Sequence, residues 1–175
     1  MSSSENSSDN SQQQPNCKKS SYRKSFSQEF EQLLNVEICP TLWVAVHKSR
    51  SSQGSMFVDI RRKKEGQWRG SKIYIPTTQG LFLKYPEYEK LKQKFEDWLS
   101  GLLLAETMEK VFEFSELTGR TVFAQQVIGA KGLTVGLKTE TKQSCLVLHR
   151  SEITKIISNS VADAIGAAMC QSLYD

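Results

Sequence analysis

The hydrophobic period of this chain changes twice from about two to about 3.6, and this change constrains the fold more than any other feature. Short runs rich in β-branched and aromatic residues come first, separated by turn residues, and an amphipathic helix pattern follows them. The same order returns after roughly 65 residues. We therefore expect an α+β protein made of two tandem modules, each with four antiparallel strands and one helix.

The first set of strand signals runs from residue 41 to residue 84. Phe57, Asp59 and Arg61 alternate with apolar residues, so they share one face of a strand. Glu65-Gly66 predicts a hairpin turn, and Pro76–Gly80 predicts a break between two strands. The expected strands are Thr41–Lys48, Ser55–Lys64, Gln67–Ile75 and Gly80–Lys84.

A helix pattern follows each set of strand signals. The first runs from Pro86 to about Lys110, with Gly101 as a point where it bends or ends. The second begins at Ser151, which we expect to cap it. The strands expected before this second helix are Val111–Phe114, Arg120–Ile128, Gly132–Thr139 and Ser144–His149.

The amino-terminal part differs in composition. Residues 1–24 are rich in Ser, Asn and Gln, which cannot bury enough apolar surface to offset ordering, so we expect a disordered tail. The basic residues in it fit a nuclear-targeting segment or a plain solubilising tail. Residues 25–40 are expected to form a short helix capped by Ser27, followed by a linker. The modules then span residues 41–108 and 109–175.

Positive charge is concentrated in the first module. Residues 41–100 contain 12 Lys or Arg and 6 Asp or Glu, whereas the segments on either side each have a net charge of −1. A local cationic excess is typical of a polyanion-binding surface, although a solvated charged face gives the same composition.

Several function classes find no support in the sequence. The four cysteines and two histidines lack metal-ligand spacing, and no apolar run is long enough for a membrane span. No nucleophile-and-base set or glycine-rich phosphate loop occurs at motif spacing. We therefore expect an intracellular, non-enzymatic protein that needs no cofactor or metal and does not contact membranes.

The candidate nucleic-acid site lies in and around the segment Met56–Arg69. Basic side chains neutralise phosphates, and an exposed tryptophan offers a base a stacking surface. The alternatives are an edge strand protected by charge and a packing role for the tryptophan across strands. The candidate residues are Lys48, Arg50, Arg61, Arg62, Lys63, Lys64, Trp68, Arg69 and Lys72.

Four other side chains have expected roles outside nucleic-acid binding. Trp43 and Trp98 are predicted to be core residues, because one is flanked by apolar strand residues and the other lies on the apolar helix stripe. Asp59 is expected to pair with Arg61, two residues along the same face. His47 is expected to be an ordinary surface histidine, with a phosphate contact as the alternative.

Four pieces of the first module resemble, in order, the positive cofactor 4 family of single-stranded-DNA-binding transcriptional coactivators. Leu42–Val46 fits its first strand, and Phe57-Val58-Asp59-Ile60-Arg61 resembles its hallmark second strand. Glu65-Gly66-Gln67-Trp68 resembles its Asp-Gly-Glu-Trp hairpin. Pro76–Leu83, followed by Glu87–Leu91, resembles its Pro-x-Lys-Lys-Gly-Ile-Ser-Leu segment and helix. The match covers about residues 41–100.

The chain departs from the family at two places. Thr78-Gln79 stands where the family has a basic pair, and Arg62–Lys64 stand where aromatic residues often follow the Asp-Ile-Arg motif. These departures make Trp68 the main stacking candidate.

The resemblance implies two whirly or Pur-like modules that pack helix against helix and expose curved sheets, as a pseudo-dimer within one chain or as a homodimer. It further implies a nuclear single-stranded-DNA-binding protein that acts with the transcription machinery, or a replication or recombination accessory. A protein-interaction scaffold and an RNA-binding matchmaker of the same fold are the alternatives.

Overall fold

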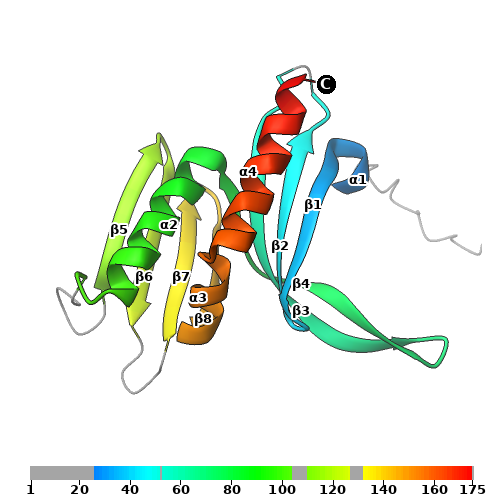
Figure 1. The fold of residues 1–175 in the computed structure, drawn as a ribbon, viewed down its shortest axis with the longest axis horizontal. Coiled ribbons are helices and arrows are strands. Elements are labelled where there is room, and N and C mark those ends of the chain that lie inside the picture. The colour runs from blue at the N-terminus through cyan, green and yellow to red at the C-terminus, as the bar shows by residue number, and fades with distance from the viewer. Residues whose placement is uncertain (1–25, 52, 104–109, 127–131, 175) are drawn as a thin grey trace, which may run out of the picture.

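A computed structural model of the chain describes residues 26–51, 53–103, 110–126 and 132–174, so the predicted tail at residues 1–24 lies outside the described part. The protein is α+β, with two four-stranded antiparallel sheets (Figure 1). The first sheet contains β1 (Phe30–Cys39), β2 (Leu42–Ser49), β3 (Met56–Trp68) and β4 (Ser71–Lys84). The second contains β5 (Lys110–Leu117), β6 (Arg120–Gln126), β7 (Gly132–Thr139) and β8 (Gln143–His149). The described helices are α1 (Phe26–Glu29), α2 (Tyr85–Leu99), α3 (Arg150–Ile156) and α4 (Asn159–Tyr174).

The first sheet begins earlier in the chain than the sequence predicted. The predicted helix is reduced to the four residues of α1, and the predicted linker is strand β1, paired with β2 along its length. Leu34, Val36 and Ile38 alternate with polar residues and pack on the core, which is strand periodicity. The helix predicted over Leu33 and Leu34 is therefore wrong, because the apolar residues of this segment repeat every two positions.

The hairpin of the first sheet turns at Arg69-Gly70, not at the predicted Glu65-Gly66. Both turn residues have positive φ, 50° and 78°, as a two-residue turn of the favoured twist requires. Glu65 pairs with Tyr74 in the ladder, so β3 and β4 continue well past the predicted turn.

The predicted strand break at Pro76–Gly80 is a bulge inside β4. Arg61 pairs with Gly80 and Lys63 pairs with Pro76, so the segment between Pro76 and Gly80 is longer than the one opposite it. Proline has no N–H for a ladder, and an irregular position tolerates it. One long strand thus replaces the predicted third and fourth strands.

The second sheet is close to its prediction. Strand β7 has the predicted bounds, and β5 and β8 begin one residue before the predicted strands. The described part of β6 ends at Gln126, and residues 127–131 lie outside the described part.

The helix that directly follows each sheet, α2 or α3, begins in the same way. Glu87 in the first turn of α2 accepts a hydrogen bond from the Lys84 backbone N–H at 2.9 Å, and Glu152 in α3 accepts one from His149 at the same distance. His149, not the predicted Ser151, is thus the N-cap. Helix α2 ends at Leu99, just before Gly101 with φ 78°, which is the position where the sequence predicted a bend or an end, and it does not continue to Lys110.

The helices cross between the two sheets. Helix α2 follows β4 but also contacts β5 of the second sheet, whereas α3 and α4 follow β8 and contact β1 of the first (Figure 1). Helix α2 also contacts α3, so part of the predicted helix-to-helix packing is present. Each predicted module is therefore completed by a helix from the other.

The core lies between the helices and the covered faces of the sheets. It includes Leu42, Val44, Ile60, Leu133 and Ile165, each at most 1 % exposed. Trp98 is buried, as predicted, but Trp43 is half-buried on the opposite face of β2. Alternation places Trp43 away from its buried neighbours, which corrects its assignment to the core.

Candidate nucleic-acid interface

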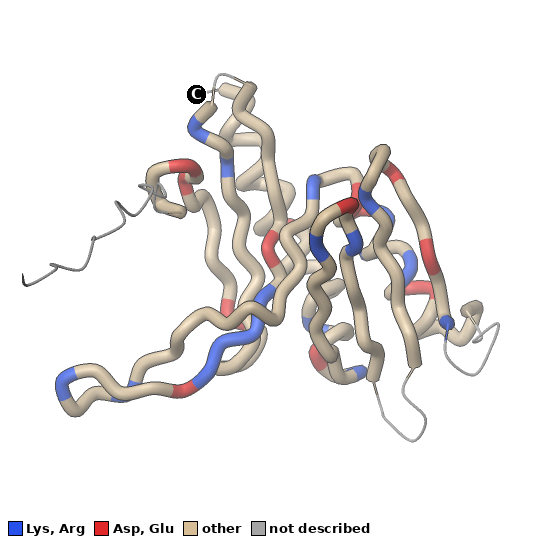
Figure 2. The backbone as a smooth tube through the Cα atoms, turned by 180° about the vertical axis from the view of Figure 1, so that it is seen from behind, with Lys and Arg blue, Asp and Glu red and all other residues tan. Residues whose placement is uncertain are grey.

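The helix-free faces of the two sheets lie on the same side of the molecule (Figure 2). Strands β4 and β8 are the neighbouring edges of the two sheets and contact each other. A groove of about 630 Å³, here called the seam groove, runs along this contact. Three cationic side chains, Arg61, Arg120 and Lys142, line it, and Phe82 forms part of its wall.

Arg61 is fixed against the wall of the seam groove. Its Nε donates to both carboxylate oxygens of Asp59, at 3.0 and 3.1 Å, which confirms the expected pairing. Its Nη1 donates to the carbonyl oxygen of Thr77 in the bulge, at 2.8 Å. The guanidinium lies over Gly80, where an added Cβ would come within 2.6 Å of its Cζ. Glycine is therefore required there for Arg61 to lie flat.

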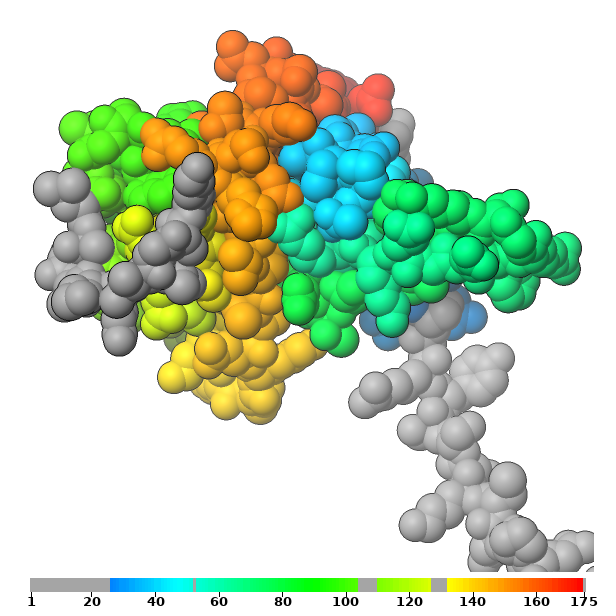
Figure 3. Space-filling view, turned by 90° about the horizontal axis from the view of Figure 1, so that it is seen from below, coloured from blue at the N-terminus to red at the C-terminus, as the bar shows by residue number. Residues whose placement is uncertain are grey.

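The distal part of the β3–β4 hairpin, residues 63–76, projects from the body of the protein (Figures 1 and 3). We call it the arm. Trp68 is 63 % exposed next to the turn, and the Arg69 guanidinium lies 5.6 Å from its ring centre. Lys72 forms an exposed ion pair with Glu65, with an N–O distance of 3.2 Å. Exposed ion pairs are weak, so Lys72 remains available to a phosphate.

Lys63 and Lys64 lie at the base of the arm and differ in environment. The Lys63 ammonium is 3.9 Å from the centre of the Trp43 ring, a cation–π contact. Burial lowers the pKa of Lys63, and Asp59 and Glu37 partly oppose this effect. Lys64 is exposed on the arm.

Three of the predicted phosphate-binding residues instead support the fold. The Lys48 ammonium donates to the carbonyl oxygen of Ser172 in the last turn of α4, at 3.4 Å, where a cation is favoured. The Arg50 Nε donates to the carbonyl oxygen of Ser27 in α1, at 3.1 Å. Arg62 is on the core side of β3 and joins the two sheets.

Arg62 and Arg120 make matching contacts across the seam. The Nη2 of Arg62 donates to Glu152 at 2.6 Å and to the Val147 carbonyl oxygen in β8 at 2.7 Å. The Nη2 of Arg120 donates to Glu87 and to the Phe82 carbonyl oxygen in β4, both at 3.0 Å. Each carboxylate is the one that also accepts from the backbone N–H at the start of its helix.

The electrostatics of Glu152 follow from this arrangement. Burial alone would raise the pKa of Glu152, but the hydrogen bonds from Arg62 and from the His149 backbone outweigh burial, so the pKa is lowered. The hydrogen bond to Glu152 raises the pKa of Arg62 correspondingly. Both groups therefore stay charged, and this pair is unavailable to a ligand.

A group of aromatic rings covers the helix-free face of the first sheet, and the sequence reading did not identify it. We call this group the aromatic face. Phe57 and Phe82 stack with ring centres 4.5 Å apart, and Phe30 packs edge-on against both. Phe26 lies over Phe30, at 4.8 Å, and is 51 % exposed. The alternation of β3 had placed Phe57 on this face, but its partners come from three other segments.

His47 lies within the aromatic face, not on the surface as expected. It is 5 % exposed, and the Phe26 ring meets it edge-on at 4.9 Å. Its Nε2 is 3.9 Å from Asp59, while its Nδ1 is buried without a hydrogen-bond partner. Burial lowers the pKa of His47, and the opposing effect of Asp59 is smaller. His47 is therefore a neutral imidazole that packs against Phe26 and has one buried polar atom without a hydrogen-bond partner.

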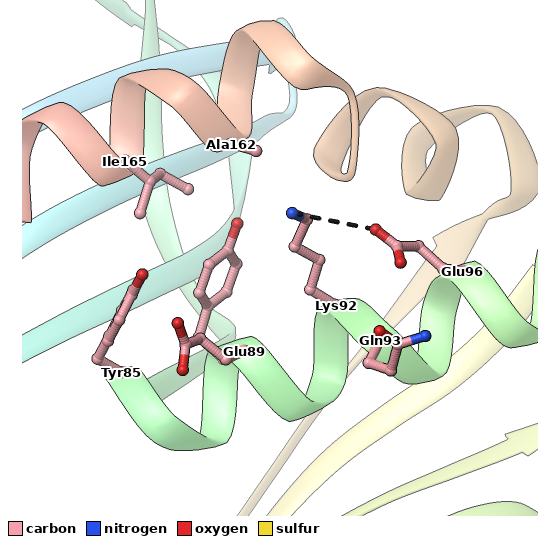
Figure 4. A pocket seen from close by; sticks show the side chains of 8 residues that line it. Tyr85, Glu89, Lys92, Gln93, Glu96, Ala162 and Ile165 are labelled. Atoms are coloured by element: carbon pink, nitrogen blue, oxygen red, sulfur yellow. Dashed lines mark ion pairs between the residues drawn. The ribbon is translucent and has the colours of Figure 1, made fainter.

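A second hollow lies on the opposite side, between α2 and α4 (Figure 4). It has a volume of about 240 Å³ and contains the Lys92–Glu96 ion pair, 3.9 Å long, together with Glu89. Tyr88 also lines it, and burial raises the pKa of Tyr88 to about 12. Two carboxylates and one paired lysine make this hollow unfavourable for a phosphate.

Within the described residues, no group of three or more His, Cys, Asp or Glu side chains is arranged to hold a metal ion. None of the described helices has the length and hydropathy needed to cross a membrane.

Comparison of the chain with models of known protein families, with curated proteins and with solved structures found no match.

Proposed function

We propose that this protein binds single-stranded nucleic acid, in the first instance DNA, along the seam groove and the arm. The observation that carries the proposal is the placement of two cationic side chains, Arg61 and Lys142, beside an aromatic wall in one groove on the helix-free side, where Arg120 is held by Glu87. Phosphates require cations and unpaired bases require flat rings, and a single strand offers both at once. The proposed role is binding, not catalysis.

The predicted site residues divide into two sets under this proposal. Arg61 acts in the groove, and the phosphate-binding residues of the arm are Lys63, Lys64, Arg69 and Lys72. Trp68, more than half exposed beside Arg69, supplies a second stacking surface at the tip of the arm. Lys48, Arg50 and Arg62 contribute to stability, because they lie outside both the seam groove and the arm and each bonds to another element of the protein.

We also infer that the two sheets and their helices are a fused pair of whirly or Pur-like modules, as the resemblance to the positive cofactor 4 family implies. Two features support this inference: each sheet runs directly into a helix, and each helix begins with the same carboxylate contact. With the basic residues of the first module, the inference favours a nuclear transcription cofactor or a replication or recombination accessory.

The test is anisotropy of a fluorescent 20-nucleotide oligo-dT measured over a range of salt. The variant Lys64→Ala/Arg69→Ala/Lys72→Ala removes three arm cations, and Lys90→Ala/Lys94→Ala/Lys155→Ala removes three from the helix side. We expect the arm variant to reduce the slope of log affinity against log salt by about 2, since each phosphate contact on a single strand contributes about 0.7. Equal slopes for the two variants would contradict the proposal.

Competitors separate the remaining possibilities. An oligo-rU that displaces the oligo-dT at lower concentration would identify the RNA-binding alternative. A duplex that competes as well as the single strand would overturn single-strand preference.

A further inference from the structure

We propose that the aromatic face is a nucleobase-binding subsite and that Phe26 covers it in the unbound protein, occupying the place of a stacked base. This inference rests on the proposed function and names the part of the nucleic acid that the first sheet recognises. A base, in place of Phe26, stacks on the neighbouring rings and hydrogen-bonds to His47.

The rings of the aromatic face lie next to the seam groove. Phe82 belongs to the aromatic face and also lines the seam groove, so the two surfaces are continuous. Arg61 lines the same groove and pairs with Gly80, two residues before Phe82 in β4. A strand whose phosphates lie beside Arg61 and Lys142 therefore has its bases within reach of the Phe82 ring.

Phe26 covers the other rings of the aromatic face. Phe26 is the most exposed ring of the group and comes from a helix of four residues. Two hydrogen bonds from Arg50 hold this segment: its backbone N–H donates to Glu29 at 2.9 Å and its Nε donates to Ser27 at 3.1 Å. Because α1 is a single short helix outside the strand ladder, its displacement costs less than displacement of a sheet strand.

The imidazole of His47 is buried beneath the surface of the aromatic face. A buried polar atom without a partner costs stability, and the Nδ1 of His47 is such an atom. An unpaired base carries donors and acceptors at its edge, whereas the ring of Phe26 carries none. A base in the place of Phe26 gives the Nδ1 of His47 the hydrogen-bond partner that it lacks. A purely structural apolar cluster does not require a polar atom at this position.

Affinity for the fluorescent 20-nucleotide oligo-dT tests the proposal in the full chain. Phe26→Ala removes the cover, and we expect affinity to rise by about fivefold or more; Phe82→Leu removes the stacking ring, and we expect a fall of similar size. Phe26→Ala/His47→Leu should lose part of the gain. Leu102→Ala is the control for the loss of an exposed apolar side chain elsewhere, since Leu102 is 77 % exposed.

The outcomes distinguish the two proposals. If the wild-type protein binds and neither Phe26→Ala nor Phe82→Leu changes affinity relative to Leu102→Ala, the subsite is overturned while the proposed function stands. If Phe26→Ala weakens binding while near-ultraviolet circular dichroism shows an intact fold, Phe26 is a contact and not a cover, which also overturns it. If no variant and no wild-type protein binds any single strand, the proposed function fails and the subsite fails with it.

Discussion

Arg62 and Arg120 come from strands that are not counterparts in the two sheets, β3 and β6, yet they reach equivalent partners. Each guanidinium meets the first-turn carboxylate of the helix that follows the opposite edge strand. Each also binds a carbonyl oxygen two residues before the N-cap of that helix. The two arginines thus join the sheets to each other and the helices to the seam.

Removal of one partner from this contact should be costly. We expect Arg62→Met and Glu152→Gln each to lower the free energy of unfolding by about 3 kcal/mol, because each leaves the other group charged or polar in a site with little water. The double variant should lose less than the sum of the two. Urea unfolding followed by tryptophan fluorescence measures all three, and strictly additive losses would show that the pair is not coupled.

The same pair gives a pH dependence. Because the pKa of Glu152 is lowered in the folded protein, its contribution is complete above the ordinary value of 4.5 and is lost as pH falls through the lowered value. The stability difference between wild type and Glu152→Gln should therefore shrink below about pH 4.5. Lys64→Met, an exposed change two positions from Arg62, should stay within about 0.5 kcal/mol of wild type throughout.

The arm depends on a turn whose first residue is poorly suited to it. Arg69 has φ 50°, a conformation that asparagine tolerates better than arginine. We expect Arg69→Asn to slow amide hydrogen exchange in the arm severalfold while weakening oligo-dT binding at low salt, because the turn improves and a cation is lost. Lys72→Gln is the matched control, and it should weaken binding without slowing exchange.

This turn also explains why the first sheet was harder to predict than the second. Gly66 looks like a turn residue next to Glu65, but it faces Ile73 in the ladder, whereas arginine gives no turn signal at position 69. In the second sheet, Gly119 has φ 75° and lies in the turn between the first two predicted strands. The first hairpin contains two glycines, Gly66 and Gly70, and pairing across the sheet, which the local sequence does not show, decides which of them lies in the turn.

The crossed helices make the two halves of the molecule dependent on each other. We expect residues 26–103 alone and residues 110–174 alone to be unfolded or to self-associate, because each sheet lacks the helix that covers it. Co-expression of the two fragments should give a stable heterodimer. Size-exclusion chromatography with light scattering measures this, and a monomeric, cooperatively folded first fragment would contradict it.

The candidate site was predictable only where its residues are close together in the sequence. The charge excess and Trp68 are local in sequence and identified the arm. The seam groove is formed by β3, β4, β6, β7 and β8, and the aromatic face by α1 and β1 to β4. These segments are distant in the sequence, so no local pattern predicts that they lie together. The alternation of side chains along β3 is also local and places Arg62 on the core side. It could not show that Glu152 of α3 lies there to accept its hydrogen bonds.

The crossing of α4 onto β1 has a consequence for synthesis. About 120 residues separate the end of β1 from the start of α4, and a ribosome adds roughly 5–20 residues per second. The apolar side of the first sheet thus waits on the order of ten seconds for the helix that shields it. Chaperone binding to the nascent chain should be strongest in this interval, before α4 is made.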